Sequence, residues 1–413
     1  MGAPFPFLKS AQFVVLCAIL SVVGALQAET TNDSPVNIDA TLAPIIARAE
    51  IPGMAAVVLR GDKVVALGVA GVRKRGAPEL ISPNDQFQIC SCTKAMTATV
   101  AAILIEEGKL GWDTTIAEIF GDTINNVNPA WRTVTLRQIL AHRAGLNDHM
   151  MSYLPELLSG KKSDLPKERR KYVARVLARA PDSPPGTKFV YSNTDYILVG
   201  AALEKITGRS WEDLLQERLF RPLGITSGGF GPPGASGQID QPWGHGRHCL
   251  FHVPLFGHGN TPFDPDSTGA DYPSMYGPAG TVHLSIGDWA KFAALHLRGD
   301  PANPNCQASV LRPDTFRRLH EAAPGEDYFG GWVLTTKAWA KGGRPGDIGR
   351  VFFHVGDNGR WNSVVWIAPE IDFAVLVVCN RGSMWGPCDQ VAAALLGTFA
   401  AKPLPSRANL PAP

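Results

Sequence analysis

The first residues that could do chemistry are Ser91 and Lys94, three positions apart in the stretch from Cys90 to Lys94. The apolar run that follows, ended by Gly108, predicts a helix with Ser91 at its amino-terminal end. Residues three apart on a helix share a face, so the hydroxyl of Ser91 would lie beside the amine of Lys94. A half-buried lysine has a lowered pKa and can remove the proton of a serine, which makes the hydroxyl a nucleophile.

Two alternatives to this pair are present in the sequence. A second Ser-x-x-Lys spacing, Ser159 to Lys162, lies in a polar segment with no apolar helix behind it, which predicts a solvated loop. Cys92 is also a nucleophile by type, yet it stands two residues before Lys94 and would point away from the amine on a helix. We therefore interpret Cys90 and Cys92 as small buried packing residues.

A phenol and a carboxamide follow in Tyr191-Ser192-Asn193, the only Tyr-x-Asn triplet among the seven tyrosines. The triplet stands between a strand-like piece and a helix predicted from Asp195 to Gly208, and such loops often carry functional side chains. On the triplet alone, a tyrosine packed in the core and an asparagine capping the next helix is an almost equal alternative.

A third candidate is His354-Val355-Gly356, at the end of a predicted strand. The edge of this strand could hold a substrate backbone, and Gly356 would allow that backbone to approach closely. The competing candidate, the triplet from Lys341 to Gly343, lies in a Gly- and Pro-rich turn before the strand. We therefore rank it second.

The other histidines indicate neither a metal nor a cofactor, and we expect none. His245, His248, Cys249 and His252 are close in the chain, but their spacing matches none of the common zinc patterns. His142 stands at a predicted helix end, where we interpret it as bonding loop carbonyls rather than as catalytic.

Composition restricts the class of protein. The chain has 413 residues, 45% of them hydrophobic, which allows a large core and favours two domains or one large domain with an insertion. The formal net charge of +2, with no basic stripe among aromatic residues, argues against nucleic acid as a partner. We expect the partner to be a small molecule or a short peptide.

The amino-terminal segment has the pattern of a signal peptide. The apolar run from Phe13 to Leu26 is short for a bilayer span, and a cleavage site after Ala28 fits it. A retained anchor is the alternative, and in both cases we expect a periplasmic or secreted protein. Without Cys17, six cysteines would remain in an oxidising compartment, where disulfides can form, and the sequence does not define their pairing.

The predicted elements describe an α/β (α+β) fold in which helices sandwich an antiparallel sheet. Strands are predicted at 54–60 and 64–69, and four more between 329 and 379, while 124–224 is mainly helical and 226–280 is a long irregular segment. The predicted organisation is a signal peptide at 1–28, a sheet domain at 29–123 plus 275–402, a helical insertion with a cleft-lining loop at 124–274, and a tail at 403–413.

The three motifs that begin at Ser91, Tyr191 and His354 resemble, in order and separation, those of the class C β-lactamase and D-alanyl-D-alanine carboxypeptidase family of penicillin-binding-protein-like serine hydrolases. The likeness extends over most of the mature chain and includes the stretches 107–110 and 330–332. It implies the β-lactamase/transpeptidase-like fold. No Gly-x-Ser-x-Gly motif supports an α/β-hydrolase instead.

The resemblance implies a role for each motif residue. Ser91 would attack a carbonyl and form an acyl-enzyme, and Lys94 and Tyr191 would share the base and acid roles. Asn193 would orient Lys94 and the substrate amide. The backbone N–H groups of Ser91 and Asp357 would form the oxyanion hole.

Two residues depart from the family pattern. Class C β-lactamases resemble one another in carrying Lys-Thr-Gly as the third motif, whereas this chain has His354 and Gly356 there as substrate-binding candidates. Histidine is mostly neutral at neutral pH, so binding of a substrate carboxylate should be weaker, and the acidic Asp357 is expected to repel anions. The substrate stays open between a β-lactam, a D-amino-acid peptide and an ester, and a non-catalytic ligand binder is the alternative.

Overall fold

The computed structural model describes residues 34–148, 164–250 and 253–400, except for the side chains of 248–250 and 253–258. The described residues between Pro35 and Ala400 belong to one compact unit. The predicted signal peptide at 1–28, the second Ser-x-x-Lys copy at Ser159 and the tail at 403–413 lie outside the described residues. Among the helices of the described part, none is long and apolar enough to cross a membrane.

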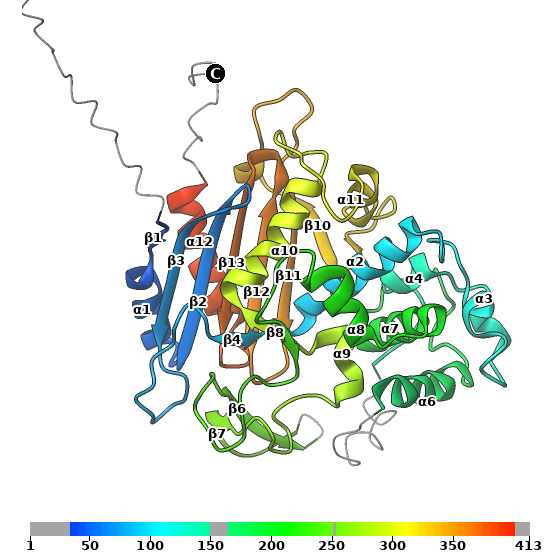
Figure 1. Ribbon diagram of the computed structural model, residues 1–413, viewed down its shortest axis with the longest axis horizontal. Helices are drawn as coiled ribbons and strands as arrows, with labels where there is room; N and C mark the ends of the chain where they lie inside the picture. The colour runs from blue at the N-terminus through cyan, green and yellow to red at the C-terminus, as the bar shows by residue number, and fades with distance from the viewer. Residues whose placement is uncertain (1–33, 149–163, 251–252, 401–413) are drawn as a thin grey trace, which may run out of the picture. The chain divides into compact units, whose positions relative to one another are not determined.

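An eight-stranded sheet runs through this unit, in the order β1-β3-β2-β13-β12-β11-β10-β9 (Figure 1). Every neighbouring pair is antiparallel except β1 with β3. The strands are β1 (Val36–Asn37), β2 (Gly53–Arg60), β3 (Lys63–Gly71), β9 (Tyr328–Phe329), β10 (Trp332–Thr336), β11 (Arg350–Asp357), β12 (Asn362–Ala368) and β13 (Phe373–Cys379). A strand from the first part of the chain and one from the last part are neighbours in the middle of the sheet, because β2 pairs with β13.

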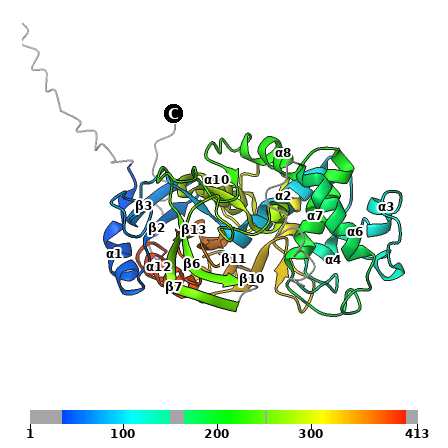
Figure 2. The same ribbon diagram turned by 90° about the horizontal axis from the view of Figure 1, so that it is seen from below.

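Helices cover both faces of the sheet, as predicted. Successive strand residues point to opposite faces of the sheet. Ala55, Val57 and Leu59 of β2 therefore enter one core, while Met54 and the residues two and four positions after it enter another. The second core is closed by α1 (Asp39–Arg48) and α12 (Trp385–Phe399). On the opposite face α10 (Ile286–Gly299) packs against β2 and β13, as Figures 1 and 2 show.

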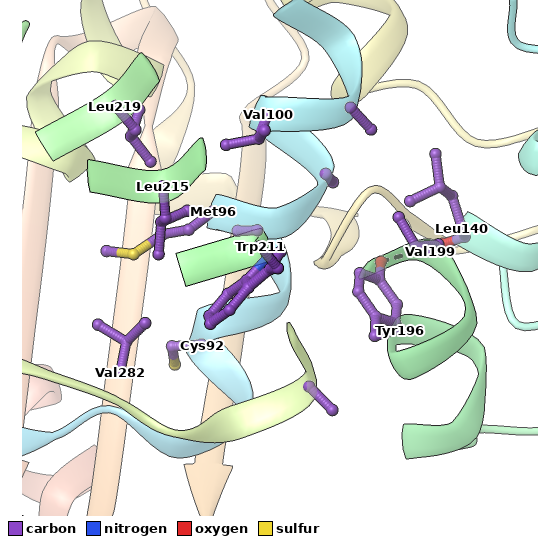
Figure 3. Close-up of a cluster of buried hydrophobic side chains, with 14 of the residues drawn as sticks. Cys92, Met96, Val100, Leu140, Tyr196, Val199, Trp211, Leu215, Leu219 and Val282 are labelled. Atoms are coloured by element: carbon purple, nitrogen blue, oxygen red, sulfur yellow. Dashed lines mark hydrogen bonds between the residues drawn. The ribbon is translucent and has the colours of Figure 1, made fainter. Parts of the chain in front are cut away.

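The helix α2 (Thr93–Glu106) lies in the core, and its residues from Thr93 to Leu104 are all buried. Figure 3 shows Met96 and Val100 of α2 beside Leu215 on one side and Tyr196 and its helix on the other. The helices that pack against α2 include α7 (Asn193–Thr207), α8 (Trp211–Leu215), α9 (Gly277–Gly280) and α11 (Pro313–Leu319). Behind them, α7 is covered by α3 (Ile116–Phe120), α4 (Leu136–Leu140) and α6 (Leu165–Leu177). Sheet and helices share one hydrophobic core around α2, and the domain boundaries drawn from the sequence stay a prediction.

The segment 226–280, predicted to be irregular, contains strands. β6 (Gly244–Leu250) and β7 (Val253–Phe263) form a hairpin, and β5 (Gly229–Phe230) pairs with β8 (Val282–Ser285). β8 also pairs with β4 (Gln86–Gln88), directly before the predicted nucleophile. Sequence reasoning missed the hairpin because its strands are rich in glycine and histidine and lack an alternation of apolar residues.

The described cysteine side chains are all free thiols: Cys90, Cys92, Cys306, Cys379 and Cys388. The sulfur atoms of Cys379 and Cys388 lie 3.6 Å apart between β13 and α12. Cys90 and Cys92 are buried, as predicted.

Candidate active site

Ser91 lies on a tight turn between β4 and α2. The residues Cys90–Cys92 form a 3₁₀ turn, and the α-helix begins only at Thr93, two residues later than the sequence predicted. Cys90 has a φ of 48°, a left-handed conformation that is uncommon for a residue with a Cβ. Such backbone strain is often found at functional sites. The turn brings Ser91 out of the fully buried helix and leaves its side chain partly accessible.

Lys94 is buried, with no exposed surface. Its Nζ lies 3.0 Å from Ser91 Oγ, 2.7 Å from Asn193 Oδ1 and 2.8 Å from the carbonyl oxygen of Ala279. Burial lowers the pKa of Lys94 from 10.5 to about 7, and the nearby carboxylate of Asp148 opposes this shift. A large fraction of Lys94 is therefore uncharged at neutral pH.

The contacts of Lys94 define what the neutral amine can do. The oxygens of Asn193 and Ala279 are carbonyl oxygens, which can only accept hydrogen bonds. A neutral amine has two N–H bonds and one lone pair, so the two N–H bonds go to these two oxygens. The lone pair is then directed at Ser91 Oγ, in position to accept its proton.

Tyr191 contacts the same oxygen of Ser91. Its hydroxyl donates a hydrogen bond of 2.9 Å to Ser91 Oγ, and the residue as a whole is 38% exposed. Burial of the hydroxyl raises the pKa of Tyr191 well above its ordinary value, although the bond to Ser91 works in the other direction. Tyr191 is therefore a proton donor at neutral pH.

Asn193, the first residue of α7, connects Lys94 to an acidic side chain. Its Oδ1 accepts from Lys94, and its Nδ2 donates a 2.7 Å hydrogen bond to Asp148 Oδ2. The alternative in which Tyr191 is a core residue and Asn193 only caps the helix does not describe this geometry.

His354 lies on β11 close to Tyr191, with ring centroids 6.3 Å apart. Burial, together with the nearby amine of Lys94, lowers the pKa of His354 to about 3, so the ring is neutral. Its Nδ1 donates to the carbonyl of Val355 at 2.7 Å, and its Nε2 lies 3.3 Å from the hydroxyl of Tyr328. Both ring nitrogens therefore already have partners within the protein.

Gly356 is required by the chain itself. A Cβ at this position would lie 2.2 Å from the carbonyl oxygen of Ile89 and 3.0 Å from the Cβ of Cys90. β11 can therefore pack against the Ser91 turn only because residue 356 is glycine. The sequence-based reason, close approach of a substrate backbone, is not needed to explain the residue.

The expectation that Asp357 repels anionic substrates stays a prediction, and the strand directs its carboxylate away from His354 and Gly356. Alternation along β11 places Asp357 on the face opposite to His354 and Gly356. Its carboxylate accepts from the backbone N–H groups of Gly359 at 2.6 Å and Ser383 at 2.8 Å. The oxyanion hole made by the N–H groups of Ser91 and Asp357 stays a prediction.

The alternative third motif lies far from Ser91. Lys341 is exposed and stands beside Gly349, just before the first residue of β11. Gly356 stands near the other end of this strand, roughly 20 Å away at the usual rise per residue. The ranking of His354 and Gly356 above Lys341 to Gly343 agrees with this placement.

Sequence reasoning missed two acidic side chains at the site, Asp148 and Asp195. The interpretation of His142 was wrong about its partner, because its Nδ1 lies 2.7 Å from Asp195 Oδ2 and not beside a loop carbonyl. Burial lowers the pKa of His142 and raises that of Asp195, so the pair carries no net charge. The His142 ring packs against Tyr191, with centroids 4.5 Å apart. No local sequence pattern connects residues so far apart in the chain.

Within the described side chains, no group of three or more His, Cys, Asp or Glu residues is arranged to hold a metal ion. His245 is engaged by the backbone, with its Nδ1 2.8 Å from the Asn380 carbonyl and its Nε2 accepting from the N–H of Arg75. The other members of the predicted non-metal cluster, His248, Cys249 and His252, lie outside the described side chains.

Comparisons with known proteins agree with this arrangement. A model of the family described as Beta-lactamase matches residues 38–396. "Penicillin-binding protein 4" of Amycolatopsis lactamdurans is 26% identical over 363 residues, which cover 86% of this chain and 87% of that protein. "Protein flp" of Staphylococcus aureus (strain N315) is 24% identical over 86% of this chain, which spans only 65% of that protein's length.

A solved structure gives the same fold. The D-amino acid amidase from Ochrobactrum anthropi SV3, complexed with L-phenylalanine, superimposes with a TM-score of 0.67 at 20% identity. The match covers 87% of this chain and 98% of the amidase. The predicted β-lactamase/transpeptidase-like fold is thereby confirmed.

Proposed function

The chain belongs to the beta-lactamase family of serine hydrolases, and from this premise we propose that it cleaves an amide or ester bond through an acyl-enzyme on Ser91. One observation carries the proposal. Ser91 Oγ has a lysine amine of lowered pKa at 3.0 Å and a protonated tyrosine hydroxyl at 2.9 Å. A base and an acid on the same oxygen are what formation and release of a serine ester require.

The proposed reaction assigns every proton. The neutral amine of Lys94 accepts the proton of Ser91, and Oγ forms a bond to the substrate carbonyl carbon. The bond to the leaving group then breaks, and the leaving nitrogen or oxygen takes the proton of Tyr191. Lys94 returns its proton to Tyr191. In deacylation, the oxygen of a water molecule bonds to the acyl carbon and its proton goes to the neutral amine of Lys94. The bond between this carbon and Ser91 Oγ then breaks, and Lys94 returns the proton to Oγ.

The neutral His354 supports a substrate class. A lysine in the third motif would offer a cation to a substrate carboxylate, but the imidazole of His354 is uncharged and both of its nitrogens have partners. We therefore favour substrates whose recognised part is uncharged, namely amides and esters, including D-amino acid amides. β-Lactams and peptides with a free carboxylate rank below them.

The place of action is part of the proposal. The apolar run from Phe13 to Leu26 supports export, so we propose that the protein works in the periplasm or after secretion on a small or short-peptide substrate.

A serine-reactive fluorophosphonate probe tests the proposal without knowledge of the substrate. We expect the wild type to be labelled and Ser91→Ala to be unlabelled. The matched control is Ser159→Ala, which removes the other Ser-x-x-Lys serine and should label like the wild type. Absence of labelling in a folded wild type would favour the non-catalytic ligand binder.

A substrate panel then separates the subclasses. Nitrocefin, p-nitrophenyl acetate, a D-alanyl dipeptide and a D-amino acid amide are compared by kcat/KM at the same pH. We expect the ester and the amide to exceed nitrocefin and the dipeptide. A preference for the dipeptide, with its free carboxylate, would contradict the substrate class inferred from His354.

A further inference from the structure

Asp148 binds the start of α7 from outside the helix. Its Oδ1 accepts from the Ser192 hydroxyl at 2.8 Å, from the backbone N–H of Thr194 at 3.2 Å and from the Thr194 hydroxyl at 3.4 Å. Its Oδ2 accepts from Nδ2 of Asn193 at 2.7 Å. The helix has no capping bond from its own preceding side chain, so Asp148 supplies the cap from a different part of the chain.

The same carboxylate determines the orientation of the Asn193 amide. An ionised carboxylate has no hydrogen to donate, so only the NH₂ group of Asn193 can face it. The carbonyl oxygen of Asn193 must then point the other way, where Nζ of Lys94 lies at 2.7 Å. If the amide were reversed, its NH₂ group would face Lys94 and would compete with Ser91 for the amine's lone pair.

We propose that Asp148 is a positioning residue for the reaction: its carboxylate holds the Asn193 amide so that Lys94 can receive the proton of Ser91. This inference rests on the proposed function, and it gives a role to a side chain that touches neither Ser91 nor the reacting atoms. Asp148 also acts through its charge. Among the groups that raise the pKa of Lys94 against the effect of burial, the Asp148 carboxylate is the strongest.

The other groups that raise the pKa of Lys94, namely Cys92, Cys90 and Asp195, do so less than Asp148. The pKa values of Cys90, Cys92 and Tyr191 are raised, and those of His142 and His354 are lowered, so these five groups stay uncharged around neutral pH. Asp195, with its raised pKa, is neutral beside its histidine. The pH at which Ser91 becomes reactive should therefore respond to the charge at residue 148.

The test compares rates of fluorophosphonate labelling between pH 5 and 10. Asp148→Asn keeps the shape of the side chain but leaves it only one acceptor oxygen. The variant must therefore lose its hydrogen bond from either Asn193 or the N–H of Thr194. We expect labelling at pH 8 to fall roughly tenfold or more, the scale of one hydrogen bond to a charged group. The half-maximal point should move to lower pH, because loss of the negative charge lowers the pKa of Lys94 further.

A second variant keeps the test decisive if the first folds poorly. Asp148→Asn combined with Asn193→Asp exchanges the two side chains and restores a donor facing an acceptor. The carboxylate then touches Lys94 directly, so the half-maximal point should move above that of the wild type. The single and the exchanged variants are expected to shift in opposite directions, which a purely structural cap would not produce.

The control is Asp164→Asn, which changes the acidic cap of α6, an exposed carboxylate 3.0 Å from the N–H of Lys167. We expect its labelling profile to match the wild type. A wild-type profile in Asp148→Asn, or equal shifts in the single and exchanged variants, would overturn the inference. The proposed function would still stand in that case, provided that the wild type is labelled and Ser91→Ala is not. An unlabelled wild type would overturn both.

Discussion

The reactivity of Ser91 should follow the titration of Lys94, with half of its maximum near pH 7. Burial lowers the pKa of Lys94 from 10.5 to about 7, and only the neutral amine can accept the serine proton. From the ratio of the two protonation states, about 10% of Lys94 is neutral at pH 6 and about 90% at pH 8. The rate of labelling should therefore rise roughly tenfold from pH 6 to pH 8 and then level off.

The assay is the second-order rate of fluorophosphonate labelling, read by gel fluorescence at fixed ionic strength. A probe without titratable groups assigns the pH dependence to the protein. Asp271, whose pKa burial raises to about 6, is the group most able to distort the acid side of the profile. Asp271→Asn is the control for this effect, and in this variant the labelling rate should still reach half of its maximum near pH 7.

Two results would refute this reasoning. A lysine of ordinary pKa would be only about 0.03% neutral at pH 7, and the rate would then climb tenfold per pH unit up to pH 10 without a plateau. A rate that stays flat between pH 5 and 9 would mean that no group titrating near neutrality activates Ser91.

Two further predictions concern other parts of the site. Tyr191→Phe should lower kcat by at least about a hundredfold, the usual scale for a general acid or base, with little change in melting temperature; an unchanged rate would remove Tyr191 from the mechanism. Gly331→Ala should lower the urea-derived free energy of unfolding by about 2–4 kcal/mol, because residue 331 has a φ of 84° and its new Cβ would lie 2.3 Å from the backbone nitrogen of Ala95. Its control, Gly343→Ala, meets no atom within 4 Å and should stay within about 0.5 kcal/mol.

Local features of the sequence were sufficient to find the candidate reacting groups. The spacing of Ser91 and Lys94 predicted that the two side chains meet, and they do so at 3.0 Å although Ser91 lies in the 3₁₀ turn before α2. Strands were found where β-branched and other apolar residues form short runs between turns, as in β12 and β13. They were missed in the glycine-rich β6 and β7, where His245 of β6 bonds to the distant backbone of Arg360 and Asn380.

Asp357 and Gly356 show what spacing along the chain does not contain. The sequence identified both positions, but the direction of the Asp357 carboxylate depends on the backbone N–H of Ser383, and the need for glycine at 356 depends on the carbonyl of Ile89. These partners belong to other elements and meet only after the sheet has formed.

The sequence by itself identified the candidate groups of the site, an alcohol, an amine, a phenol and an imidazole, and their order along the chain. Only the tertiary structure decided their protonation. The pKa of a side chain depends on the atoms within a few ångströms of it. For Lys94 these atoms come from Asp148, Asn193 and Ala279, which are separated from it by 54 to 185 positions in the chain and are brought to it by folding.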